Sequence, residues 1–189
     1  MRAILALGNP GDRYRDTRHN AGWWLADRLV RVWSLPPFGR SGGAVRTGGT
    51  VRGEAVEVLK PLTYVNRSGE ILEPLSRRAG WETRRDLLVL VDDIWLEPGV
   101  FRLRSRGSPG GHRGLASLES AAGTREYARL RIGVGRPPDA RIDLAAWVLS
   151  AMPPAEEDRV LDAFPPAVEA VECWLEEGIE AAMDRFNRR

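Results

Sequence analysis

The 189-residue chain has one cysteine, one lysine and two histidines, and these shortages exclude several kinds of site. Cys173 alone cannot form an internal disulfide. Two histidines and one cysteine in unrelated contexts match no metal-ligand spacing, so no metal site is expected. No apolar run approaches the roughly 18 residues of a membrane span, so membrane insertion is not expected either. The N-terminus lacks a charged-then-apolar signal segment, which predicts a cytoplasmic location.

Because lysine is so scarce, arginine carries nearly all of the positive charge. Lys60 is the only lysine among 28 basic residues. The net charge of +2 hides an uneven distribution, since residues 153–189 hold ten acidic and four basic residues, leaving sixteen acidic and twenty-four basic residues in 1–152. The planar guanidinium suits phosphate, which favours a polyanionic partner for the body of the chain. A genomic preference for arginine explains the same count equally well.

Apolar periodicity predicts an alternation of strands and helices. Strands are expected at Arg2–Leu7, Gly42–Arg52, Glu54–Leu59, Asp86–Val91, Val100–Arg104 and Tyr127–Val134, the second and third forming a hairpin. Helices are expected at Ala21–Trp33, Tyr64–Gly80, Gly114–Ala122, Asp143–Ser150 and Ala155–Asn187, the last interrupted at Pro165-Pro166. The pattern predicts one α/β domain over residues 1–189, with a central mixed, twisted sheet and helices on both faces. Sites in such sheets form at the carboxyl ends of strands.

His19 lies in a polar loop between the first strand and the first helix, away from any apolar face. A loop histidine is often solvated and without a role. Asp92, however, ends the clearest central strand, and a carboxylate there can orient a histidine and raise its basicity. Ser68 and Ser108 lack the sequence context of an activated nucleophile, so an activated water is the more natural attacker.

The second histidine, His112, lies in the glycine-rich run Gly107–Gly114. The run is either a flexible loop or a backbone that closely approaches a bulky ligand. It matches neither a Walker loop nor a dinucleotide fingerprint. Asn9 and Asn66 follow apolar strands, where Asn commonly stabilises turns; as functional groups, their amides would donate hydrogen bonds to a developing oxyanion.

Two predicted strands carry alternating arginines. The period of two places Arg102 with Arg104, and Arg129 with Arg131, on one face of each strand. They are either a patch for phosphate or exposed residues that aid solubility.

Five short motifs, in order along the chain, together resemble the bacterial peptidyl-tRNA hydrolase family, and the resemblance runs from Met1 to about residue 185. They are Gly8-Asn9-Pro10-Gly11, Tyr14-x-x-Thr17-Arg18-His19-Asn20-x-Gly22, Lys60-Pro61-Leu62-Thr63 with Asn66-x-Ser68-Gly69, Asp92-Asp93, and Gly110-Gly111-His112-x-Gly114-Leu115. The resemblance implies hydrolysis of the ester that joins a peptide to the 3′ end of tRNA. It also implies that His19 is the general base on water and Asp92 its orienting partner.

The resemblance assigns the remaining candidates to the substrate. Asn9 and Asn66 would hold the carbonyl and the peptide backbone, and Asn20, Tyr14 and His112 would shape the cleft around the 3′ adenosine. The four arginines, Arg102, Arg104, Arg129 and Arg131, match basic positions near the acceptor stem and its 5′ phosphate.

The chain departs from the family at two substrate-facing positions. Arg113 stands where the family usually has Asn, so an amide is lost and a charge that suits phosphate is gained. Val65 stands where the family usually has Met, so one wall of the cleft should be less filled. Both positions remain candidate substrate contacts.

The leading hypothesis is therefore a monomeric, cofactor-free hydrolase of peptidyl-tRNA that needs no protein partner. A catalytically silent RNA-binding relative and a small-molecule esterase unconnected to RNA are the alternatives. The short helix Asp143–Ser150, flanked by Pro137-Pro138 and Pro153-Pro154, and the acidic C-terminal helix are expected to border the cleft as a movable gate.

Overall fold

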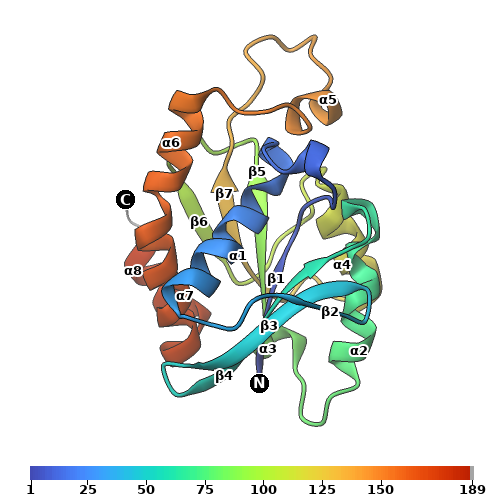
Figure 1. Cartoon of the computed structure of the whole chain (residues 1–189), viewed down its shortest axis with the longest axis vertical. Coiled ribbons are helices and arrows are strands. Elements are labelled where there is room, and N and C mark those ends of the chain that lie inside the picture. Colours follow the sequence, from blue (N-terminus) through green and yellow to red (C-terminus); the bar gives the residue numbers. More distant parts are fainter. Residues whose placement is uncertain (188–189) are drawn as a thin grey trace.

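Within residues 1–187, which this computed structural model describes, seven strands form one central sheet (Figure 1). They are β1 (Arg2–Ala6), β2 (Gly39–Ser41), β3 (Ala44–Val51), β4 (Glu54–Pro61), β5 (Leu87–Asp93), β6 (Phe101–Arg104) and β7 (Ala128–Gly133). Their order across the sheet is β2-β3-β4-β1-β5-β7-β6. Strands β4, β1, β5 and β7 are parallel, whereas the pairs β2–β3, β3–β4 and β6–β7 are antiparallel. The predicted mixed sheet is confirmed.

Helices cover both faces of this sheet because alternate residues of the central strands are buried on opposite sides. Ile4 and Leu88 belong to the apolar cluster that packs against one set of helices: α1 (Ala21–Val32), α6 (Pro154–Asp162), α7 (Phe164–Glu177) and α8 (Ile179–Phe186). Leu5 and Val89 belong to the cluster on the opposite face, which includes residues of the 3₁₀ segment η3 (Val65–Ile71), α2 (Leu72–Ser76) and α4 (Arg113–Ala122). Figure 1 shows the two sets on opposite sides of the strands.

The predicted hairpin is confirmed, and its turn lies at Arg52-Gly53. Both residues have positive φ, 52° for Arg52 and 81° for Gly53. Tight two-residue hairpin turns favour this combination because it matches the twist of the flanking strands.

The prediction of one helix over Tyr64–Gly80 was wrong. The segment forms η3 and then the short helix α2. Gly69 lies so close to helix α4 that a Cβ atom there would come within 2.3 Å of the Ser117 carbonyl oxygen. The close packing against α4 needs glycine at this position, and glycine weakens the α-helix that the apolar pattern predicted.

The C-terminal region has more breaks than predicted. Pro165 and Pro166 occupy the first turn of α7, where the missing N–H groups of proline cost little. A second break lies at Gly178, whose φ of 88° separates α7 from α8. The short elements β2 and α3 (Thr83–Asp86) were not predicted, since neither has a clear apolar period.

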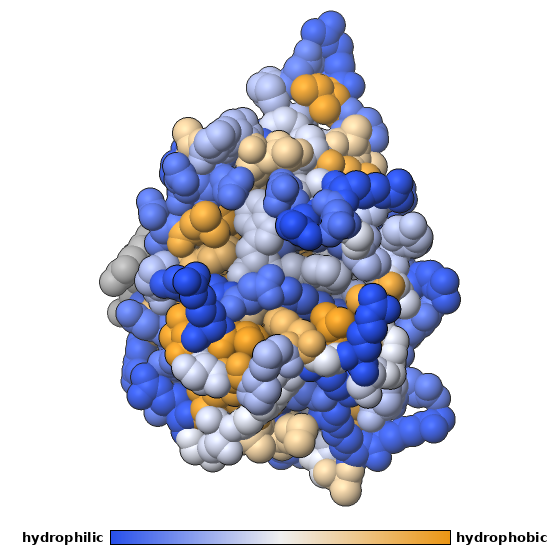
Figure 2. Space-filling view, in the orientation of Figure 1, coloured by the Kyte–Doolittle hydropathy of each residue, from blue (hydrophilic) through white to orange (hydrophobic). Residues whose placement is uncertain are grey.

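The carboxyl ends of β4, β1, β5 and β7 meet at one edge of the sheet, and the polar loops gather there. This edge also carries two 3₁₀ turns, η1 (Asp12–Tyr14) and η2 (Arg18–Asn20), and the short helix α5 (Leu144–Val148). The segment between β7 and α5 projects beyond the body in Figure 1, and Figure 2 shows this protruding tip as mainly hydrophilic. Among the described residues, no helix has the length and apolar character needed to cross a membrane.

Candidate active site

A cavity of about 460 Å³ opens at this edge of the sheet and collects most of the predicted site residues. Those in its wall are Asn9, Tyr14, His19, Val65, Asn66, Asp92, His112, Arg113 and Arg131. Among the described residues, none of α6, α7 or α8 lines the cavity, so the expectation that the acidic C-terminal helix borders the cleft was wrong. Helix α5 contributes Leu144 and Val148, so the predicted position of this helix beside the cleft is confirmed. Its mobility stays a prediction.

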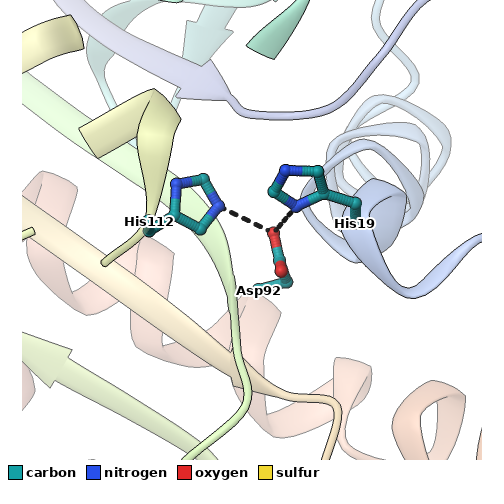
Figure 3. A group of neighbouring side chains, drawn as sticks. All are labelled: His19, Asp92 and His112. Carbon is teal, nitrogen blue, oxygen red and sulfur yellow. Dashed lines mark hydrogen bonds and ion pairs between the residues drawn. The ribbon is translucent and has the colours of Figure 1, made fainter. Parts of the chain in front are cut away.

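Asp92 contacts both histidines of the chain through a single oxygen (Figure 3). The distance from Asp92 Oδ1 is 2.8 Å to His19 Nδ1 and 3.0 Å to His112 Nε2. Burial by itself would raise the pKa of the Asp92 carboxyl, but the two histidines outweigh burial and hold that pKa well below its usual range. The carboxylate is therefore ionised and can only accept hydrogen bonds.

The other ring nitrogen of His112 identifies the protonation state of that residue. His112 precedes α4, and its Nδ1 accepts hydrogen bonds from the backbone N–H groups of Gly114 (3.1 Å) and Leu115 (3.3 Å). A nitrogen that accepts cannot carry a proton. His112 is consequently the tautomer that carries its proton on Nε2, and this N–H donates a hydrogen bond to Asp92. The side chain thus caps a helix in addition to lining the cavity.

His19 has the opposite arrangement. Its Nδ1 faces the ionised Asp92, so Nδ1 carries the proton and Nε2 keeps a lone pair in the neutral ring. Burial of the ring favours the neutral form, but the charge and hydrogen bond of Asp92 outweigh it and raise the pKa of His19 above 6.5. The ring is oriented and more basic than usual, as a general base requires.

The cluster of His19, Asp92 and His112 could in principle hold a metal, since one ligand atom from each lies within 4.8 Å of the others. The hydrogen bonds argue against it. For His112 Nε2 to coordinate a cation, its proton would have to move to Nδ1, which faces two N–H donors. The donor set therefore fits a proton-bridged group rather than a metal centre.

Asn9 is held by three hydrogen bonds that leave one of its groups for a ligand. Its Oδ1 accepts the backbone N–H of Val65 at 2.9 Å. Its own N–H and C=O pair with the side-chain amide of Asn20, at 2.8 and 3.0 Å. With Oδ1 engaged, the Asn9 NH2 group is the donor available to the cavity. Asn20 itself is only 1% exposed and is absent from the cavity wall, so it acts on Asn9 rather than on the cleft.

The outer wall of the cavity is aromatic. Tyr14 and Tyr64 meet edge to face, with ring centroids 6.4 Å apart, and Arg13 stacks on Tyr14 at 4.5 Å. Val65 lies buried behind them and Asn66 is exposed at the rim. Tyr64 was not predicted, because an exposed tyrosine after a strand has no periodic signal.

The four predicted arginines share one face of the sheet, since β6 and β7 pair antiparallel with Arg102 opposite Arg131 and Arg104 opposite Arg129. Their environments differ. Arg131 lines the cavity and forms an ion pair with Asp93 at 2.6 Å. Arg102 and Arg104 are partly exposed beside it.

Arg129 differs from the expectation of a phosphate contact. It is 2% exposed, stacks on Tyr127 at 4.3 Å, and donates hydrogen bonds to the backbone oxygens of Ser108 and Arg125, both at 3.2 Å. Ser108 belongs to the glycine-rich loop that precedes His112. Arg129 therefore holds that loop in place.

Arg18, next to His19, makes a set of contacts that was not predicted. Its guanidinium stacks on Trp147 at 3.7 Å, and it donates hydrogen bonds to Ala151 O (2.7 Å) and Glu156 (2.5 Å). It fastens the end of α5 and the start of α6 to the turn that carries His19. Its hydrogen-bond partners Ala151 and Glu156 lie 133 and 138 residues away in sequence, so no local pattern could have indicated them.

The family comparison agrees with this geometry. The family model described as peptidyl-tRNA hydrolase matches residues 3–189. The chain belongs to the peptidyl-tRNA hydrolase family. It is 45% identical to the peptidyl-tRNA hydrolase of Gemmatimonas aurantiaca, with all of both chains covered, and 47% identical to that of Symbiobacterium thermophilum, with 97% of each covered. Its fold matches the crystal structure of the Acinetobacter baumannii peptidyl-tRNA hydrolase, with a TM-score of 0.91 at 30% identity over 100% of this chain and 95% of the other.

Proposed function

We propose that this protein hydrolyses the ester between the peptide and the 3′ end of tRNA, using a water molecule that His19 activates. The observation that carries this proposal is the arrangement of His19 between an ionised carboxylate and an open cavity. Its Nδ1 faces Asp92 and its Nε2 retains a lone pair. A small neutral nucleophile needs a base of this kind, and general-base help contributes about 100- to 10,000-fold in rate.

In the proposed reaction, His19 Nε2 takes a proton from water as the water oxygen bonds to the ester carbonyl carbon. The carbonyl oxygen becomes an oxyanion, and Asn9 Nδ2 and the Asn66 amide donate hydrogen bonds to it. Such a donor is worth about 100- to 1,000-fold in rate. The intermediate then releases the 3′ oxygen of tRNA, which accepts the proton from His19. Asp92 stabilises the transient imidazolium, while His112 keeps Asp92 in place.

The remaining wall would contact the two halves of the substrate. We assign the 3′ adenosine to the surface formed by Tyr14, His112 and Arg113, with Val65 behind it. The tRNA phosphates are assigned to Arg102, Arg104 and Arg131, and Arg129 acts through the Ser108 loop. We further propose that the protein acts as a monomer in the cytoplasm, without a cofactor or an obligate protein partner.

The test makes three measurements on the wild-type protein: cleavage of peptidyl-tRNA, cleavage of a small ester of the same acyl group, and binding of tRNA. Release of free peptide from peptidyl-tRNA, with little cleavage of a small ester of the same acyl group, is the expected result. Tight tRNA binding without cleavage would favour the silent RNA-binding alternative. Equal cleavage of the small ester, with no salt-dependent affinity for tRNA, would favour a general esterase.

A further inference from the structure

Trp95 is the one tryptophan among the described residues that is mostly exposed to solvent. The chain has seven tryptophans, and the others are buried or half-buried. Trp95 is 58% exposed and lies in the wall of the active-site cavity, three residues after Asp92. A large exposed aromatic ring beside a catalytic cavity has no role in the core and is suited to contact a ligand.

The loop that carries Trp95 is held rigidly. Asp93 Oδ1 accepts the Trp95 backbone N–H at 2.9 Å, two residues from the strand end. Backbone hydrogen bonds then join this loop to the end of β7: Val134 N to Asp93 O at 3.0 Å, Gly135 N to Leu96 O at 3.0 Å, and Gly133 N to Val100 O at 2.8 Å. A ring mounted on such a loop is ordered before a ligand arrives, so binding costs little conformational entropy.

One face of the Trp95 ring is already covered by a cation. The guanidinium of Arg136 lies 4.1 Å from the ring centroid. Because the residue is still 58% exposed, we infer that the other face of the ring is open. Arg131 lies in the same cavity wall, paired with Asp93. The surface thus offers a free aromatic face flanked by positive charge.

The sheet order places this surface on one particular side of the catalytic group. Asp92 ends β5, and the amides of Asn9 and Asn66 follow β1 and β4, on one side of β5. Strands β7 and β6, with the arginines, lie on the other side. The loop of Trp95 is bonded to β7 and so belongs to the arginine side. Given the proposed function, the acyl group lies toward the amides and the RNA toward the arginines.

We propose that Trp95 and Arg136 form a stacking platform for an unpaired nucleobase of the strand that leads to the esterified 3′ nucleotide. This rests on the proposed function. The base stacks on the free face of Trp95, and the adjoining phosphate lies near the guanidinium groups. Stacking of this kind tolerates any base, because every base has a π face. An aromatic peptide side chain is the competing occupant, but the position on the arginine side favours a nucleotide.

The experiment compares peptidyl-tRNA with a peptidyl-adenosine that lacks the upstream nucleotides. We expect Trp95→Ala to raise KM for peptidyl-tRNA about 5- to 100-fold with little change in kcat, and to leave the short substrate unaffected. Trp95→Phe should recover most of the loss, because the aromatic face is retained. Arg136→Ala should also raise KM for peptidyl-tRNA and leave the short substrate unaffected. Leu161→Ala, which removes an exposed apolar side chain on α6, is the control for Trp95→Ala, and Arg40→Ala, on the edge strand β2, is the control for Arg136→Ala.

An equal loss on both substrates would overturn the platform, since it would place Trp95 against the acyl group or the reacting atoms. No loss on peptidyl-tRNA would overturn it as well. If the wild type cleaves neither substrate, the proposed function fails, and the platform is then decided by fluorescence titration with a single-stranded RNA trinucleotide. Quenching in the wild type that disappears in Trp95→Phe supports the platform, and identical titrations contradict it.

Discussion

At the scale of single residues, the centre of the site is the carboxylate of Asp92, which contacts two histidines in different tautomers. His112 is fixed as the Nε2–H form by the backbone donors of α4, so it cannot serve as a base toward the cavity. His19 meets the same oxygen through Nδ1 and keeps Nε2 unprotonated. The difference between the two rings comes from what each second nitrogen faces, and only one ring is left able to accept a proton from water.

The raised pKa of His19 predicts the pH dependence of the reaction. A base works only in its neutral form, so kcat/KM should fall as the pH drops below a value higher than 6.5, and should level off above it. Asp92→Asn removes the charge that raises this pKa. The acidic limb should then move to lower pH while the plateau rate falls at least about 100-fold. A limb that stays in place in Asp92→Asn would contradict the pairing.

His112 has two separable roles, in capping α4 and in holding Asp92. His112→Ala should lose both, costing about 1 kcal/mol of unfolding free energy and part of kcat. Asparagine is a good N-cap, so His112→Asn should recover the stability without the Asp92 contact. Urea unfolding and kcat measured on both variants test this. Recovery of kcat together with stability in His112→Asn would show that only the cap matters.

At the scale of elements, helix α5 is the part of the cavity wall with the least support from the core. It has no buried residue and spans only Leu144–Val148. Its end is fastened by Arg18, whose backbone N–H donates to Ser150 O at 3.1 Å, and by Trp147, whose indole N–H donates to Gly135 O at 2.8 Å. The segment is therefore anchored at one end, which is the arrangement that a hinged gate requires.

Removing the anchor should loosen the gate. Arg18→Ala leaves Glu156 without its partner. Breaking a fully buried ion pair costs about 3–5 kcal/mol, and because Glu156 is 28% exposed we expect a smaller loss, roughly 2–3 kcal/mol, in unfolding free energy. Hydrogen exchange across residues 137–151 should accelerate while that of β5 stays slow. Arg18→Lys keeps the charge but not the planar guanidinium. Its exchange rate across this segment should therefore fall between the rates of the wild type and of Arg18→Ala. Uniformly slow exchange of this segment in the wild type would rule out a gate.

The sequence predicted the elements where apolar periodicity was clear. It missed the features that depend on contacts between residues far apart in the chain. The apolar pattern placed Asn9, Asn66 and Asp92 after strands, and sites in such sheets form at the carboxyl ends of strands. The structure agrees, since all three residues line the cavity at that edge of the sheet. The same period put Arg129 on the right face, but its burial depends on the Ser108 loop, which has no period. The Arg18–Glu156 contact spans 138 residues and depends on how α6 packs, which no local signal reveals.

At the scale of the whole molecule, charge is divided between the body and the C-terminal helices. The body carries an excess of arginine, and the acidic residues concentrate after residue 152. Strands β6 and β7 bring Arg102 and Arg131 together, and Arg131 lies in the cavity wall that also contains Trp95.

A phosphate-binding surface predicts a steep salt dependence of tRNA affinity. Each lost phosphate contact should reduce the slope of log K against log salt by about 0.7 to 0.9. The double variant Arg102→Ala, Arg104→Ala should therefore weaken tRNA binding. It should also reduce the slope by the amount expected for the loss of one or two phosphate contacts. Arg40→Ala, on the opposite edge strand β2, should change neither. Equal slopes in the double variant and the wild type would remove these two arginines from the RNA surface.

The most direct measurement is single-turnover release of peptide from peptidyl-tRNA by the wild type and by His19→Ala, at a pH above the His19 pKa. The predicted result is rapid release by the wild type and a loss of about 100- to 10,000-fold in His19→Ala, with tRNA affinity unchanged. Full turnover by His19→Ala would contradict His19 as the base.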